Sequence, residues 1–557
     1  MGNLSNKFFG LGETGRMKSA AAARLGRHGG VVAAAFSLLF AAAPGAHAAN
    51  FSCGWTDAGD NWTTAGDWSG CNGASPNNGG GNTYDATIST GSPSLTSAIS
   101  IGNVTVNSSG AWYVRGANAA ATLSGNLTNS GSVELDPFGG DGGASLNVGG
   151  ALTNSNFVQI GNTALSANTT LSATALSNTG TGTIDIYGNG ANQAALKVSG
   201  AAGFGAAGVI SGQVNLQNNS LVQFGSGGLT SIASGGQLAL NGAGAQVQIA
   251  GNTANNNALS GLSSNAGFLY LRNGASLATT TGLDNSSNLE LDPFGGDGGA
   301  TLNVGGTLTN SNLVQIGNTA LSADTTLSAT AVSNTGTGTI DLFGNGASQA
   351  ALKIAGAAGF GTAGVVSGQV DLNGNNLVQF GSGGLTGIAA GGQLALDGGD
   401  SQVQILGNSA NNNALTGLAS NAGLFYLRNG ASLTTTTGLD TSNQLLLDIF
   451  GGDGGASLGV GGTLTNNNYV QIGNTALSAN STLSANAVDN TGTGTIDLFG
   501  NGASQAALKI AGAAGFGAAG VVSGQVNLQN NSLVQFGSGG LSSIAAGGQL
   551  SLNGADA

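Results

Sequence analysis

Charged residues are scarce in this chain of 557 residues, where Asp, Glu, Lys and Arg together make up 6%. The balance is acidic, with 24 acidic residues, 11 basic residues and a formal net charge of −13 at pH 7. Five of the 11 basic residues precede position 30, so six remain for the rest of the chain. Six basic residues cannot neutralise a row of phosphates, so we expect neither nucleic acid nor an anionic membrane surface as a partner.

Histidine is equally scarce. The only two, His28 and His47, lie in an N-terminal segment that we expect to be removed on export. Ser-His-Asp catalysis and histidine-ligated metal sites therefore require a residue that the mature chain lacks. We expect no catalytic residue, no cofactor and no enzymatic activity. Paired carboxylates, which suffice for glycoside hydrolysis, are the catalytic chemistry that the composition leaves open.

Cysteine is limited to Cys53 and Cys71. No histidine remains in the mature chain to activate either thiol as a nucleophile. Exported proteins meet an oxidising compartment, so we expect one disulfide between the two residues. Two free buried thiols are the alternative.

Long hydrophobic runs are missing except at 31–43, VVAAAFSLLFAAA, which follows three basic residues. This run is too short to span a bilayer but has the length of a signal-peptide core. Small residues at the −3 and −1 positions place the cleavage site after Ala48. We therefore predict a signal peptide at 1–48, with Met17 as an alternative start and a buried helix as the alternative structure.

Proline is also rare, with 5 residues, whereas glycine contributes 103. The glycines lack the Gly-X-Y period of collagen, and a 40% share of hydrophobic residues is too high for a disordered chain. Instead, near-identical segments recur every 156 residues: LDPFGGDGG at 135–143 and 291–299, and LDIFGGDGG at 447–455. This period predicts a Trp-rich N-terminal cap at 49–105, a diverged partial repeat at 106–135, and repeats at 136–291, 292–447 and 448–557, the last one truncated.

Short apolar–x–apolar triplets recur within each repeat, for example Ile340-Asp341-Leu342. Alternation with a period of two places the outer residues on one face of a strand and the middle residue on the other. Gly and Asn between the triplets tolerate the positive φ of tight corners, and no long stretch has helical periodicity. The sequence therefore predicts an all-β fold, a parallel β-solenoid similar to right-handed β-helices and built from the 156-residue repeats.

The dimensions of the solenoid follow from its rungs. A rung is one turn of the solenoid. We expect rungs of ~20–24 residues, about seven per repeat, and an advance along the solenoid axis of roughly 34 Å per repeat. Asn residues at equivalent corners are expected to stack in hydrogen-bonded ladders. On this spacing Lys197, Lys353 and Lys509 lie too far apart to form one basic catalytic site. A β-sandwich array is the alternative fold, but it needs longer antiparallel strands than the sequence offers.

The recurring LDPFGGDGG stretch raises the question of a calcium site, since Glu290, Asp292 and Asp297 could supply hard oxygen ligands. The third copy has Leu446 in place of the glutamate. The spacing fits neither the EF-hand nor the nonapeptide calcium repeat. We therefore interpret the stretch as a Gly-rich corner, with these three residues as weak calcium candidates and no other metal site expected.

Several segments resemble a known class of exported proteins. NWTTAGDWSG with SPNNGGGNTYDATIS at 61–89, GNLTNSGSVELD at 125–136 and NTGTGTIDLFGN at 334–345 are similar to large β-strand-repeat proteins of Gram-negative bacteria. Such repeats occur in autotransporter passenger domains and in exosortase-sorted (PEP-CTERM) surface proteins. The resemblance implies a β-solenoid that is exported and displayed on the cell surface or outer membrane, or released outside the cell.

We therefore expect a non-enzymatic surface repeat protein, a structural stalk or adhesin, whose partners are host or environmental surfaces or polysaccharides. A β-helix that binds or cleaves polysaccharide through carboxylates alone is the first alternative, and a calcium-stiffened repeat module is the second. The sequence stops inside the third repeat, at a point where the second continues with the core triplet of QVQILGN. We expect further repeats there and then an anchor, through which alone the protein would meet a membrane.

Overall fold

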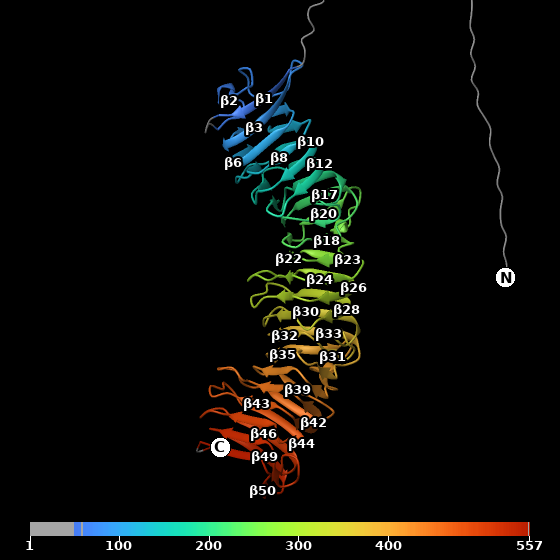
Figure 1. Ribbon diagram of the computed structural model, residues 1–557, viewed down its shortest axis with the longest axis vertical. Coiled ribbons are helices and arrows are strands. Elements are labelled where there is room, and N and C mark those ends of the chain that lie inside the picture. The colour runs from blue at the N-terminus through green and yellow to red at the C-terminus, as the bar shows by residue number, and fades with distance from the viewer. Residues whose placement is uncertain (1–48, 57–59, 555) are drawn as a thin grey trace, which may run out of the picture. The chain divides into compact units, whose positions relative to one another are not determined.

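The computed structural model describes residues 49–56, 60–554 and 556–557. The predicted signal peptide, with its cleavage site after Ala48, lies outside the described residues. From residue 49 onward, parallel strands stack into an all-β solenoid of about 18 turns (Figure 1). The predicted fold is therefore confirmed, and its structural unit is a rung of roughly 25 residues. The 156-residue period is a repeat of the sequence that spans several such rungs.

One column of strands, here called sheet 1, runs through the whole stack. Each strand pairs in parallel with the strands of the rungs before and after it. Below the C-terminal half of β6 (Val104–Val114), sheet 1 contains β9 (Ser132–Leu135), β11 (Phe157–Gly161), β13 (Thr183–Tyr187), β16 (Gln213–Gln217), β19 (Gln237–Asn241), β22 (Phe268–Arg272), β25 (Asn288–Leu291), β27 (Leu313–Gly317), β29 (Thr339–Phe343), β32 (Gln369–Asn373), β35 (Gln393–Asp397), β38 (Leu424–Arg428), β41 (Gln444–Leu447), β43 (Tyr469–Gly473), β45 (Thr495–Phe499), β48 (Gln525–Gln529) and β51 (Gln549–Asn553).

A second column, sheet 2, lies on another side of each rung and consists of three stacks. The first stack contains β7 (Ala120–Leu123), β8 (Leu127–Asn129), β10 (Ser145–Asn154), β12 (Thr169–Asn178), β14 (Ala194–Ala201), β17 (Ser220–Ser226) and β20 (Gln246–Ile249). The second contains β23 (Ser276–Thr279), β24 (Leu283–Asn285), β26 (Thr301–Asn310), β28 (Thr325–Asn334), β30 (Ala350–Ala357), β33 (Asn376–Ser382) and β36 (Ser401–Ile405). The third contains β39 (Ser432–Thr434), β40 (Leu439–Thr441), β42 (Ser457–Asn466), β44 (Ser481–Asn490), β46 (Ala506–Ala513) and β49 (Ser532–Ser538).

Two-residue strands stack in parallel on one another, and through the pairs β21–β24 and β37–β40 they lead into the second and third stacks of sheet 2. They are β15 (Val209–Ile210), β18 (Ser231–Ile232), β21 (Ser264–Asn265), β31 (Val365–Val366), β34 (Gly387–Ile388), β37 (Ser420–Asn421), β47 (Val521–Val522) and β50 (Ser543–Ile544). The helical elements are the short 3-10 turns η1 (Ala65–Asp67), η2 (Asn257–Leu259) and η3 (Asn413–Leu415). Within the described residues, no helix has the length and hydrophobicity needed to cross a membrane.

The expected rung length and rung number were wrong. Six successive pairings lead from β19 to the equivalent strand β35, so each 156-residue repeat contains six rungs instead of seven. The advance per repeat is correspondingly about 29 Å at ~4.8 Å per rung. The error arose at the corners, because some rungs include a long excursion such as the one that carries η2 between β20 and β21.

The core consists of the outer residues of the triplets. In β29, Ile340 and Leu342 are fully buried, while Thr339 and Phe343 are only partly covered. The same alternation holds along sheet 1, so Val, Leu and Ile stack on identical positions of the rungs above and below. This stacking keeps apolar side chains out of water throughout a narrow core.

The N-terminal end is braced by a disulfide and by aromatic side chains. Cys53 and Cys71 are bonded, with a Cα–Cα distance of 5.0 Å. Trp62 is fully buried, and its ring centroid lies 4.6 Å from that of Trp68 and 5.1 Å from that of Trp112. This end is built from β1 (Asn50–Trp55), β2 (Trp68–Ser69), β3 (Thr83–Gly91), β4 (Ser94–Leu95) and β5 (Ala98–Ile101). Because β2 pairs antiparallel with β1, the regular parallel stack ends there.

The predicted asparagine ladders are confirmed and lie inside the core. Asn285 donates through Nδ2 to Oδ1 of Asn310 at 2.9 Å, and Asn310 donates in turn to Asn334 at 2.8 Å. These side chains are buried, and their amides also bind backbone carbonyl oxygens of the neighbouring corner. Thr441 occupies the position equivalent to Asn285. There Asn421 donates to the Thr441 hydroxyl at 3.0 Å, in place of an asparagine amide oxygen.

The ladder makes a prediction about stability. Replacing Asn310 by Ala should lower the free energy of unfolding by about 2 kcal/mol, because neighbouring buried amide groups lose a partner. The change Thr441→Asn should instead raise it by about 1 kcal/mol, because it supplies the amide found at the equivalent position of the preceding repeat. Melting temperatures of the two variants measure both effects. An unchanged melting temperature for Asn310→Ala, or a fall for Thr441→Asn, would contradict a stabilising role of the ladder.

Candidate binding face of sheet 1

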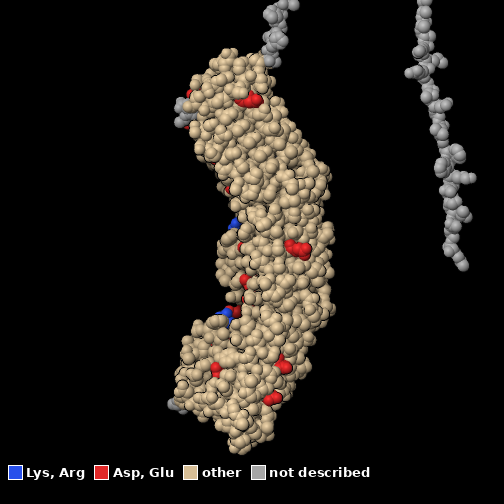
Figure 2. Space-filling view, in the orientation of Figure 1, with Lys and Arg blue, Asp and Glu red and all other residues tan. Residues whose placement is uncertain are grey.

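The outward face of sheet 1 carries one continuous column of side chains, formed by the middle residues of successive triplets. Parallel register brings each of these residues next to its counterpart on the following rung. From the N-terminal end the column reads Tyr113, Glu134, Gln159, Asp185, Asn215, Ala239, Tyr270, Glu290, Gln315, Asp341, Asp371, Ala395, Tyr426, Leu446, Gln471, Asp497, Asn527 and Ser551. Carboxylates, amides and tyrosines dominate this column. On the face of the molecule drawn in Figure 2, charged residues are few and scattered.

Two equivalent hollows open on this face, where alanine interrupts the column of larger side chains. The first pocket, of about 360 Å³, is centred on Ala239 and lined by side chains that include Tyr187, Asn215, Gln237, Tyr270, Arg272 and Phe294. The second pocket, of about 380 Å³, is centred on Ala395 and lined by residues that include Asp341, Phe343, Asp371, Asp397, Tyr426, Arg428 and Phe450. Because they lie six rungs apart, the two pockets repeat at about 29 Å.

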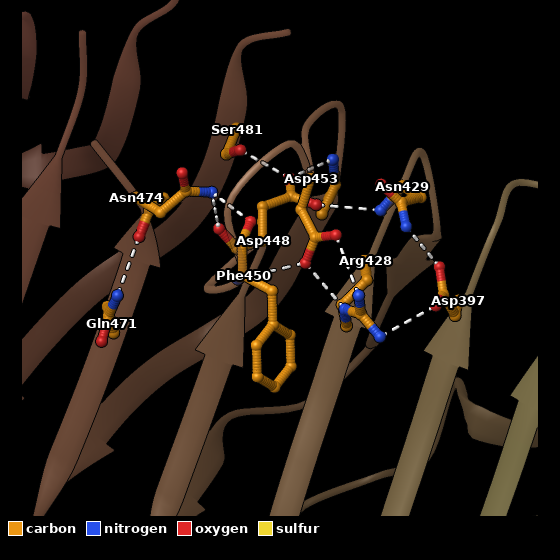
Figure 3. A network of polar contacts seen from close by, with 11 residues as sticks. Asp397, Arg428, Asn429, Asp448, Phe450, Asp453, Gln471, Asn474 and Ser481 are labelled. Carbon is orange, nitrogen blue, oxygen red and sulfur yellow. Dashed lines mark hydrogen bonds and ion pairs between the residues drawn. The ribbon is translucent and has the colours of Figure 1, made fainter. Parts of the chain in front are cut away.

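One wall of each pocket is an arginine held in place by the recurring Gly-rich corner. Figure 3 shows this arrangement for Arg428 of the second pocket. Arg428 binds Asp453 through Nε at 2.7 Å and through Nη2 at 2.9 Å, and its Nη1 lies 2.9 Å from Oδ2 of Asp397. Its guanidinium lies 4.5 Å from the ring centroid of Phe450, which is 50% exposed. This geometry fixes a planar cation and a solvent-facing aromatic ring side by side.

The first aspartate of the corner is structural. Asp448 has φ of 51°, a left-handed conformation that aspartate tolerates better than most side chains, and it is fully buried. Its Oδ1 accepts from the backbone N–H of Asn429 at 2.9 Å, and its Oδ2 accepts from Ala456 at 2.7 Å and from Ser481 at 2.5 Å. Burial raises the pKa of this carboxyl, and these hydrogen bonds oppose the rise. The aspartate thus ties three successive rungs together.

The three weak calcium candidates have separate roles. Asp292 is the buried corner aspartate of the second copy, and Asp297 forms an ion pair with Arg272 at 2.6 Å. Glu290 faces outward in the sheet 1 column and accepts from Asn288 at 2.9 Å. Among the described residues, no group of three or more His, Cys, Asp and Glu side chains is arranged to hold a metal ion. The LDPFGGDGG stretch is a corner between sheet 1 and sheet 2 that positions an arginine.

The bottom of the second pocket differs from the equivalent position in the other repeats. Asp341 and Asp371 are register partners on β29 and β32, so two carboxylates lie on adjacent rungs. The equivalent partners are Asp185 with Asn215 and Asp497 with Asn527, and in both pairs the asparagine Nδ2 donates to the aspartate at 2.8 Å. The second repeat has therefore exchanged a donor for a second acceptor.

This exchange alters the titration of the pair. Burial, followed by the charge of Asp371, raises the pKa of Asp341 from its ordinary 3.8 to about 6. Burial also raises the pKa of Asp371, although the hydrogen bond that Gln393 donates at 2.6 Å opposes the rise. At neutral pH the second pocket thus contains two carboxylates that gain from a proton or from a positive charge beside them.

A different hollow surrounds each of the three lysines in sheet 2. Lys197, Lys353 and Lys509 line cavities of about 360, 440 and 340 Å³, each next to an irregularity in the register of the strands. Each cavity combines one lysine with a glutamine and mainly apolar residues, such as Val304 and Phe380 around Lys353. The lysines are equivalent positions about 29 Å apart, so each belongs to a separate cavity.

Sequence reasoning did not identify the pockets. The arginine lies one rung before the corner that carries its phenylalanine and its aspartate, and only a correct rung length brings the three together. The recurring LYLRNGASL at 269–277 and FYLRNGASL at 425–433, each one rung before a Gly-rich corner, was the signal that could have found them. Comparisons with models of protein families, with curated proteins and with solved structures gave no match for this chain.

The carboxylate pair predicts a pH-dependent effect on stability. The folded state takes up a proton at Asp341 near pH 6 and the unfolded chain only near pH 3.8, so folding is penalised increasingly as pH rises through this window. Asp341→Asn should therefore stabilise the protein at pH 7.5, by about 1 kcal/mol after allowance for solvent screening, and by less at pH 4.

The matched control is Asp185→Asn, which removes a carboxylate that accepts from both Asn215 and Tyr187 and should destabilise at pH 7.5. Melting temperatures at the two pH values give both results. If Asp341→Asn lowered the melting temperature at pH 7.5, the repulsion between the two carboxylates would be disproved.

Proposed function

We propose that this chain is an exported, non-enzymatic repeat protein of a bacterial cell surface, a stalk that acts as an adhesin through sheet 1. The observation that carries the proposal is the recurrence of one pocket type at equivalent positions, six rungs apart, on the same face. Sites at a fixed spacing suit an extended polymer, because binding at one site raises the effective concentration of the chain at the next.

The side chains in the pockets favour polysaccharide as this polymer. Tyr270 and Phe294 in the first pocket, and Tyr426 and Phe450 in the second, offer aromatic surface against which a sugar ring can pack. Glutamine, asparagine and arginine side chains between them offer donors and acceptors for hydroxyl groups. Cavities of this size lie within the range typical of small-molecule sites, ~300–1,000 Å³.

Export is supported by the sequence and by the N-terminal end of the fold. The apolar run at 31–43 has the features of a signal peptide, and the chain resembles autotransporter passengers and sorted surface proteins. The Cys53–Cys71 disulfide suits an oxidising compartment. A solenoid that presents a long regular face is a suitable architecture for a stalk, because each added rung extends the surface without a new core.

Asp341 and Asp371 favour a second candidate function, hydrolysis of polysaccharide. As register partners they lie on adjacent strands ~4.8 Å apart, so their side chains can reach the ~5–5.5 Å carboxyl separation of retaining glycosidases. A pKa of about 6 suits Asp341 as a general acid. We rank this function second, because neither other repeat has the pair. Nothing in the corner geometry favours the third candidate, a calcium-stiffened module.

Two measurements test the proposal. The first tests surface display: brief protease treatment of intact cells of the native host should remove the protein. The second tests binding: purified chain should sediment with insoluble polysaccharides. Tyr270→Ala combined with Tyr426→Ala should reduce this sedimentation about tenfold, since each tyrosine provides stacking area. Full protection in intact cells, or unchanged sedimentation of the double variant, would contradict the proposal. Release of reducing ends that is lost in Asp371→Asn would instead support the hydrolase.

A further inference from the structure

We propose that the second pocket selects an amino-sugar polymer, whose protonated amine binds between Asp341 and Asp371, whereas the first pocket binds an uncharged sugar. This inference rests on the proposed binding role of sheet 1. The two cavities have nearly equal volumes but differ in charge and in hydrogen-bond donors.

The equivalent aspartates of the other repeats are satisfied by protein donors. Asp185 accepts from Nδ2 of Asn215 at 2.8 Å and from the hydroxyl of Tyr187 at 3.1 Å. Asp497 accepts from Asn527 at 2.8 Å and from the hydroxyl of Tyr469 at 2.9 Å. In both repeats an amide and a phenol hold the carboxylate, so neither needs an external cation.

The second repeat lacks all of these donors. Asp371 replaces the asparagine, Phe343 stands where the first repeat has Tyr187, and Leu313 stands where the third has Tyr469. No donor among the described residues hydrogen-bonds to the Asp341 carboxylate. Asp371 itself accepts from Gln393, which occupies one of its two oxygens. The pocket thus presents acceptor oxygens on two adjacent rungs, and Gln393 is the one side chain among the described residues that donates to them.

The charge of the second pocket is not compensated internally. Arg428 is the only cation among the described residues that line it, and this guanidinium is engaged by Asp453 and Asp397. The first pocket has Asn215 and Asn241 at the positions of Asp371 and Asp397, and there Arg272 pairs with Asp297 alone. Two aspartates in place of two asparagines make the second pocket more acidic. A ligand that complements it therefore carries positive charge.

An amino sugar satisfies both features of the cavity. A protonated amine has three N–H donors, enough to bridge the carboxylates of Asp341 and Asp371. The sugar ring to which it is attached can pack against Tyr426 and the exposed ring of Phe450, which line the same cavity. A bare metal ion fits poorly, because calcium takes six to eight oxygen ligands and this pocket has aromatic walls.

Isothermal titration of the mature chain with three sugar hexamers tests the assignment: glucosamine, N-acetylglucosamine and galacturonate. At pH 6 and low salt, the glucosamine hexamer should bind about tenfold more tightly than its N-acetylated form, because only the free amine is charged. The galacturonate hexamer should bind the second pocket most weakly. Asp371→Asn should abolish the preference for the free amine. This variant carries the asparagine of the other two repeats, so its fold is expected to be retained.

Two further variants exclude general attraction to an acidic protein. Asp497→Asn should leave glucosamine binding unchanged, because that carboxylate is held by its own donors. Asn215→Asp combined with Tyr187→Phe, which reproduces the residues of the second repeat, should create a second glucosamine site in the first pocket and raise the stoichiometry from one to two. Equal affinity for the free and N-acetylated hexamers, or equal losses in Asp371→Asn and Asp497→Asn, would overturn the amino-sugar assignment. If the amino-sugar assignment failed in this way, binding of the N-acetylated hexamer to both pockets would still support a polysaccharide-binding role for sheet 1. If no hexamer bound and the chain did not sediment with insoluble polysaccharides, both the amino-sugar assignment and the proposed binding role would be overturned.

Discussion

Backbone hydrogen bonding between successive rungs is the interaction on which every other feature of this structure depends. It aligns equivalent residues of neighbouring rungs in register, so that Ile340 lies beside Val314 and Val370, and Asp341 lies beside Gln315 and Asp371. Inward columns become a core, corner columns become asparagine ladders, and outward columns become surfaces of nearly uniform chemistry. A single substitution in one rung therefore acts mainly on its neighbours in the same column.

Duplication and divergence act on this framework in units of six rungs. The pocket around Ala395 preserves the position of the pocket around Ala239 while differing in charge and in donors. The corner that carries Asp448, Phe450 and Asp453 keeps its arginine in the same orientation in each repeat. The structure thus separates a constant part, the corner and aromatic walls, from a variable part, the outward residues of the strands between them.

The sequence was sufficient for the fold because period-two alternation in triplets such as Ile340-Asp341-Leu342 directly reports which side chains are buried. It was not sufficient for the rung number, because the excursion that carries η2 lengthens a rung without changing the triplets. The candidate site depended on that number: Asp341 and Asp371 are 30 residues apart, and only the register makes them neighbours. The partners of two calcium candidates depend on the register as well, since Asp292 and Asp297 are engaged by residues of the preceding rung.

The register of sheet 1 at the second pocket is the most direct test of this account. Cysteines introduced by Asp341→Cys and Asp371→Cys should be joined by a short fluorogenic thiol cross-linker, because parallel register places them on the same face of adjacent strands, ~4.8 Å apart along the solenoid axis. The control pair Asp341→Cys and Ala395→Cys lies two rungs apart and should react far less. Efficient cross-linking of the first pair alone is the predicted result. Equal cross-linking of both pairs, or of neither, would contradict the stacking of rungs from which the pockets and their proposed ligands are derived.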